Sequence, residues 1–160
     1  MAPELAAAAI PVVIDPESNL PYSFDELGAR LDNPALLRKA GVTIAFSVAG
    51  GGLHLSYNAG LALREGAGIA VANGLPYAEA LKAITLNPAA IWGIGDRFGT
   101  LTAGADADIV IWDGDPLEPS SAPAVLLVQG REVSLTTRQT ELRDRYVPAR
   151  AEDALPPGYR

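Results

Sequence analysis

The sequence predicts an α/β fold in which a parallel strand–helix–strand unit precedes several short antiparallel strands. Two compact β-branched runs, at residues 12–14 and 42–47, enclose a helix signal at Asn33-Pro34. A strand, a helix and a second strand with short connections place the two strands parallel in one sheet. After Asn87, short apolar runs separated by turn sequences indicate a second, antiparallel part.

Composition excludes several classes of protein. The chain has 160 residues, of which 49% are hydrophobic and 19% are charged, as in a folded domain. Its net charge of −7 argues against nucleic acid or an anionic membrane as a partner, because both require a basic surface. No apolar run reaches the ~18 residues of a membrane helix. The absence of cysteine excludes disulfides and thiolate metal sites and leaves the compartment unknown.

The first half is expected to contain helices between and after its two strands. Residues 5–10 are typical of the last turns of a helix that Pro11 stops. Asn33 is expected to cap the next helix, and Gly41 to end it. Residues 58–73 predict a further helix.

The second half begins with two helices and continues as strands. Residues 77–85 form the first of these helices, and Asn87 is expected to cap the second. Strands follow at residues 109–112, 125–128 and 132–135. A capping box at Thr136 and Gln139 predicts a last helix to about Tyr146, with Leu142 and Tyr146 on its buried edge.

Two long strings of the second half resemble a known family. GLPYAEALKAITLNPAAIWGI and GTLTAGADADIVIWDGDPLE are similar to the C-terminal part of imidazolonepropionase-like enzymes of the amidohydrolase superfamily. The second string follows that family's G-x-L-x-x-G-x-D-A-D-[LIV]-V pattern. The resemblance implies the C-terminal portion of a (β/α)8 TIM-like barrel plus strands of a small flanking β domain.

The resemblance also implies a division of the chain. Residues 1–95 correspond to the barrel part, with residues 12–14 as its seventh strand and residues 42–47 as its eighth. Residues 96–135 correspond to part of the small β domain, and residues 136–160 to a C-terminal helix and tail.

The family chemistry is hydrolysis of amide-like C–N bonds in small molecules by water that a divalent metal such as zinc activates. The family's metal ligands are a His-x-His after the first strand, histidines after the fifth and sixth, and an aspartate after the eighth. This sequence contains one histidine, His54, and no carboxylate between its predicted eighth strand and Glu65.

A catalytic zinc needs about three protein ligands. We therefore expect a fragment that binds no metal and is inactive alone, and that self-associates or pairs with the missing barrel part. The alternative is a non-catalytic remnant that serves as a binding or oligomerisation module.

Three residues near the predicted strand ends are candidates for a site. His54, expected in the loop after the eighth strand, is the only metal-ligand candidate. It is also a candidate for substrate contact. The alternative is that it is a loop histidine without a functional role, which hydrogen-bonds to backbone or water. Ser47 either contacts substrate or caps backbone. Asp15 either contacts substrate or begins a turn at Asp15-Pro16.

Other conspicuous residues have simpler interpretations. Gly50, Gly51 and Gly52 are compatible with an anion cradle or with close packing. Asp106 and Asp108 come at the start of a predicted strand, where they are expected to have a structural, capping role. Trp92 and Trp112 are expected to anchor a core or an interface.

Overall fold

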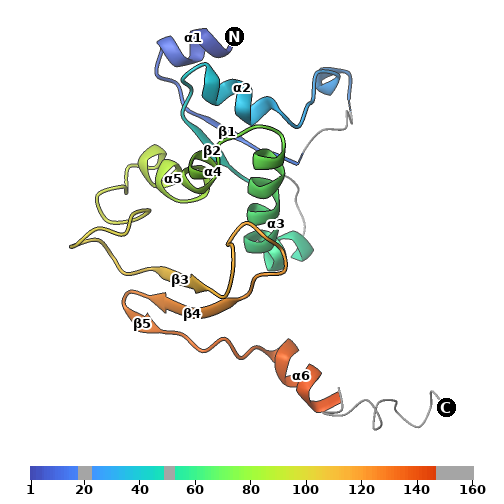
Figure 1. Cartoon of the computed structure of the whole chain (residues 1–160), viewed down its shortest axis with the longest axis vertical. Coiled ribbons are helices and arrows are strands. Elements are labelled where there is room, and N and C mark those ends of the chain that lie inside the picture. The colour runs from blue at the N-terminus through green and yellow to red at the C-terminus, as the bar shows by residue number, and fades with distance from the viewer. Residues whose placement is uncertain (18–22, 49–52, 147–160) are drawn as a thin grey trace, which may run out of the picture.

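The computed structural model describes residues 1–17, 23–48 and 53–146. It is an elongated molecule, with the first helix at one end and the last at the other (Figure 1). Helices and a two-stranded parallel sheet form one half, and a three-stranded antiparallel sheet lies beyond them.

The predicted parallel unit is confirmed. Helix α1 (Ala2–Ala7) leads into strand β1 (Val12–Ile14), and β1 pairs in parallel with β2 (Ile44–Phe46). Between the strands lie a 3₁₀ turn, η1 (Phe24–Glu26), and helix α2 (Asn33–Lys39). The second strand is shorter than expected.

The N-terminal cap of α2 differs from the expectation. Asp32, not Asn33, precedes the first turn, and no side chain caps that turn. The C-terminal end agrees, because Gly41 adopts a φ of +90°, in the left-handed region that glycine tolerates.

Four helices pack against β2, because α2 contacts it together with three later helices. Helix α3 (Leu53–Ala72) begins five residues earlier than predicted, and α4 (Tyr77–Ile84) and α5 (Leu86–Ile91) follow it. All three residues of β2 are buried, and the main core gathers around Ile44, Val42 and Leu75. Small residues such as Ala67 and Ala80 let the helices approach one another closely.

Asn87 has a different role from the predicted helix cap. Thr85 occupies the cap position of α5, and the side-chain Nδ2 of Asn87 donates to the Ile44 carbonyl at 2.8 Å. In the parallel pair, Thr43 and Ser47 bond to β1, so the Ile44 carbonyl faces the opposite edge of β2. Asn87 thus satisfies a carbonyl on that outer edge.

The second sheet is a meander of β3 (Ile109–Trp112), β4 (Pro123–Val128) and β5 (Arg131–Glu132). Gln129 and Gly130 form its two-residue turn with φ values of +51° and +73°. The hairpin is confirmed, although β5 is shorter than predicted.

The last helix, α6 (Arg138–Tyr146), is capped one residue later than expected. The Thr140 N–H donates to Thr137 Oγ1, and the Thr137 N–H donates to Thr140 Oγ1. The prediction of a buried edge is wrong, because α6 buries no residue and Tyr146 is largely exposed. Within the described parts of the chain, no helix is both long and apolar enough to span a membrane.

Candidate functional site

The carboxyl ends of β1 and β2 bring two of the predicted site residues to one edge. The register pairs Ile14 with Phe46, so Asp15 and Ser47 leave the two strands side by side. The Ser47 N–H donates to the Ile14 carbonyl at 2.9 Å. Asp15 Oδ1 accepts the Glu17 N–H at 3.0 Å, which is the turn arrangement that the sequence allowed for this aspartate.

His54 does not lie in a loop. It belongs to the first turn of α3, and its side chain lies outside the described residues. Residues 49–52, which include the three glycines, also lie outside the described residues.

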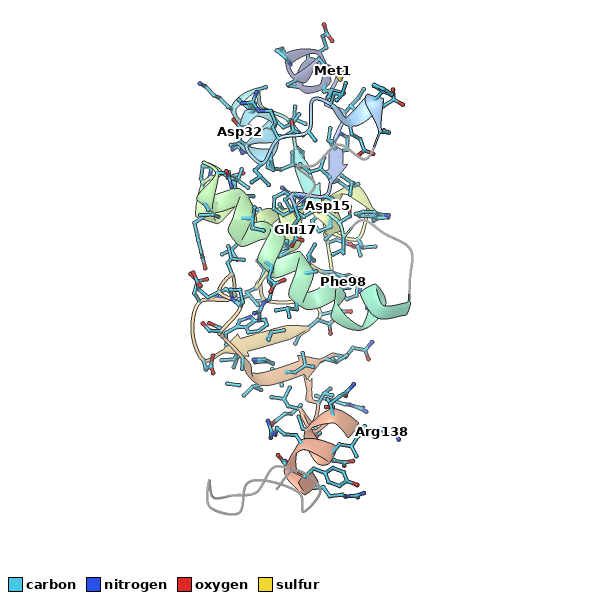
Figure 2. The ribbon with its side chains drawn as sticks, turned by 90° about the vertical axis from the view of Figure 1, so that its right-hand side faces the viewer. Met1, Asp15, Glu17, Asp32, Phe98 and Arg138 are labelled. Atoms are coloured by element: carbon cyan, nitrogen blue, oxygen red, sulfur yellow. The ribbon has the colours of Figure 1, made fainter. Side chains whose placement is uncertain are left out.

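Glu17 is a charged neighbour of this edge that the sequence did not single out. Burial, followed by the nearby carboxylates of Asp15 and Glu65, raises the pKa of Glu17 above its ordinary value. Figure 2 shows Asp15 and Glu17 close together against the helical half. Glu17, Glu65 and Glu118 line one cavity of about 440 Å³. These carboxylates come from distant parts of the sequence, so spacing alone could not reveal their proximity.

These groups do not amount to a metal centre. Among the side chains that the structure describes, which do not include that of His54, no three His, Cys, Asp or Glu come together as a metal-binding group. The strand ends supply one carboxylate, Asp15, and one hydroxyl, Ser47. A catalytic zinc needs about three protein ligands, so the described residues do not fit one.

A second set of groups joins the helical half to the antiparallel sheet. Arg64 of α3 is only 8% exposed, and its Nη atoms donate to the carbonyls of Glu118 at 3.1 Å and Ser121 at 3.3 Å. Its guanidinium lies 4.1 Å from the centre of the Trp112 ring, a cation–π contact. The sequence indicated Trp112 as an anchor, which the structure bears out, but gave no signal for Arg64.

A cavity of about 460 Å³ lies beside this contact. Leu81 and Ile84 of α4 line one side, and Ile109, Val110 and Trp112 of β3 line the other. A cavity of this size with mostly apolar walls and a few polar groups is typical of a binding site.

Asp106 and Asp108 have structural roles, as predicted. Asp106 forms an ion pair with Arg97, and Asp108 Oδ1 accepts the Gln129 N–H at 2.7 Å. Trp92, by contrast, is 62% exposed and belongs to no core.

Comparison with known proteins places most of the chain in one family. The model of the amidohydrolase family matches residues 15–140. Over 57 residues the chain is 49% identical to the amidohydrolase tasK of Hapsidospora irregularis, which covers 36% of this chain and 6% of that protein. Over 46 residues it is 46% identical to an imidazolonepropionase of Sphingopyxis alaskensis, which covers 28% of this chain and 11% of that protein.

Solved structures give the same result. An amidohydrolase from Thermotoga maritima superimposes with a TM-score of 0.73 at 31% identity, over 83% of this chain and 33% of its own. A prolidase solved with N-methylphosphonate-L-proline superimposes with a TM-score of 0.62 at 21% identity, which shows similarity of fold, over 82% of this chain and 36% of its own. This chain therefore spans about a third of the length of these structures.

The amidohydrolase family has a TIM-barrel fold and is generally metal-dependent, and the described part of this chain is a small α/β structure. The resemblance recognised in the sequence is confirmed, and the chain belongs to the amidohydrolase family.

Proposed function

We propose that this chain is the C-terminal part of a metal-dependent amidohydrolase-like enzyme that hydrolyses amide-like C–N bonds in small molecules. The match of the family model to residues 15–140 carries the proposal. Because the chain spans only about a third of its solved neighbours, the activity belongs to an assembly with further barrel strands.

In this proposal β1 and β2 are the seventh and eighth barrel strands. Their parallel pairing, with α2 between them and α3 to α5 on β2, supports that assignment. Residues 1–95 then form the barrel part and residues 96–135 part of the small β domain, followed by a C-terminal helix and tail at 136–160. The separate three-stranded antiparallel sheet agrees with this division.

We also propose that the chain on its own has no hydrolase activity. The sequence has no carboxylate between Ser47 and Glu65, where the family has an aspartate after the eighth strand, so the group expected to take a proton from water is absent. In the assembly, Ser47 and Asp15 are candidates for substrate contact, and His54 for substrate contact or for a single metal ligand. The remaining ligands of a divalent metal, zinc by family resemblance, would come from other barrel strands.

Metal analysis of the purified chain tests this proposal. After incubation with zinc and exhaustive dialysis, we expect far less than one zinc per chain by mass spectrometry, and the same value for His54→Ala. One tightly bound zinc per chain, lost in His54→Ala, would show that the chain builds its own centre and would contradict the proposal.

A second candidate function is a non-catalytic module for binding or oligomerisation. Exposed apolar side chains on the antiparallel sheet, including Val110, Ile111 and Val128, favour it. Open strand edges and apolar faces promote self-association, so we expect oligomers or aggregates by light scattering. A monodisperse monomer would contradict that expectation.

A further inference from the structure

The free edge of β3 faces the cavity between β3 and helix α4. β3 is the strand of its sheet that lies nearest the helices, with β4 and β5 beyond it (Figure 1). Ile109 and Val110 both line the cavity, although consecutive side chains of a strand point to opposite faces. The cavity therefore runs along the edge of β3 and does not lie over one face.

The pairing register leaves backbone groups of β3 available at this edge. Val110 pairs with Leu126 of β4 in the antiparallel ladder. The Leu126 carbonyl accepts the N–H of Val133, which follows β5 on the other side of β4, at 2.8 Å. Because Leu126 directs its backbone groups away from β3, the pair is of the non-hydrogen-bonded kind. The N–H and C=O of Val110 consequently point to the open edge.

The cavity also holds a buried positive charge without a carboxylate partner among the described residues. Two neutral carbonyls accept from the Nη atoms of Arg64, and its buried Nε has no hydrogen-bond partner. The acidic side chains that line the same cavity are engaged elsewhere, since Asp106 pairs with Arg97 and Asp108 accepts a backbone N–H. Buried charges are ordinarily paired, so an incoming anion would lower the free energy of this site.

We propose that the edge of β3 and Arg64 together bind an extended peptide strand that carries one acidic side chain. The strand adds to β3 through the backbone of Val110, its apolar side chains fill the space beside Leu81 and Ile84, and its carboxylate accepts from Arg64 Nε. Strand addition to a free edge supplies affinity, and side-chain pockets supply selectivity. The proposal does not depend on the proposed enzymatic function, because the edge and the arginine belong to this chain.

Synthetic peptides test the proposal without altering the site. The probe is an acetylated, amidated octapeptide, Lys-Val-Thr-Val-Glu-Val-Thr-Lys, and its matched control has Gln in place of Glu. Trp92→Phe removes an exposed tryptophan, so that Trp112 fluorescence reports binding at the cavity. We expect saturable binding of the Glu peptide and about tenfold weaker binding of the Gln peptide, because Gln offers Arg64 a neutral acceptor in place of a charged one.

Two further measurements separate the two contacts. In hydrogen exchange, the Val110 amide should become protected by the Glu peptide but not by a version N-methylated at every residue, in which neither edge of the peptide can donate a backbone hydrogen bond. Arg64→Lys should reduce the preference for Glu over Gln, provided that its circular dichroism matches the parent. Equal affinity for the Glu and Gln peptides would overturn the role of Arg64. No binding of either peptide at millimolar concentration would overturn strand addition. Binding of benzoate, a carboxylate without a peptide backbone, when neither peptide binds would also overturn it.

Discussion

The two sheets of this chain differ in how much of their apolar surface the chain itself covers. Ile44 of β2 is 1% exposed beneath four helices, whereas Ile111 of β3 is 51% exposed. Both isoleucines lie in short, strongly apolar strands that look alike in the sequence. An apolar strand pattern thus predicts a strand, but the contacts that bury it are set by the elements around it.

The contacts between the two halves are mainly polar at their margins. Arg64 ties α3 to carbonyls of the loop after β3, and the Tyr77 hydroxyl donates to Asp115 Oδ1 at 2.7 Å. The apolar space between these contacts remains open as the cavity beside β3. The helical half therefore holds the main core, to which the loop after β3 adds Leu117, while the strands of the sheet depend more on single contacts.

The largest expected effect comes from truncating the buried isoleucine. Ile44→Ala should lower the free energy of unfolding by about 2–5 kcal/mol, because it leaves a cavity in a close-packed core. The matched variant Ile111→Ala removes the same atoms from a half-exposed position and should cost roughly 1 kcal/mol or less. Urea denaturation followed by circular dichroism measures both. Equal losses would show that β3 is as well covered in solution as β2.

The next effect concerns the connection between the two halves. Gly99 has a φ of +87°, and an added Cβ would lie 2.8 Å from the Thr85 carbonyl oxygen and 2.9 Å from Ala89 Cβ. Gly99→Ala should therefore cost about 1–3 kcal/mol from overlap, in addition to about 1 kcal/mol from the left-handed backbone.

Gly104→Ala provides the control for that substitution. Gly104 has a φ of +95°, but its added Cβ meets no atom within 4 Å. It should show only the backbone cost. If both variants lose the same stability, close packing of the connection against α4 and α5 is not important.

The sequence predicted the elements better than their contacts. The β-branched runs and the Gln129-Gly130 turn identified the parallel pair and the hairpin, because these signals are local. Caps were less predictable. Asn87 has a strong local signal for a helix start, yet its amide bonds to β2, 43 positions earlier in the chain. Its Nδ2 donates to a distant carbonyl, in place of a capping role in which Oδ1 would accept a local backbone N–H.

The candidate site divides in the same way. The carboxyl ends of two parallel strands meet at one edge, so the proximity of Asp15 and Ser47 followed from the predicted topology. Glu17, Glu65 and Arg64 required the three-dimensional structure, since their partners are set by how α3 packs against distant loops. The large difference in side-chain exposure between β2 and β3 could not be predicted either, because the two strand sequences are similarly apolar.

The smallest expected effect is the pH dependence of the exposed contact between the halves. The hydrogen bond to Asp115 is the main cause that raises the pKa of Tyr77 from 10.0 to about 12, and the same bond lowers the pKa of Asp115. The raised pKa of Tyr77 means that its contribution to stability is complete below pH 10 and is lost as the pH rises through about 12. The lowered pKa of Asp115 means that its contribution is lost only as the pH falls below the ordinary range for aspartate.

Tyr77→Phe should therefore reduce stability slightly and evenly near neutral pH, with the difference from the parent shrinking at both extremes. Water screens this exposed pair, so the effect is small. Absorbance titration gives a direct measurement, since the parent should contain a late-titrating phenol that Tyr77→Phe lacks. In Asp115→Asn, that phenol should titrate closer to 10, because the carboxylate acceptor and its charge are gone. A late phenol that persists in Asp115→Asn would mean that burial, and not this contact between the halves, governs Tyr77.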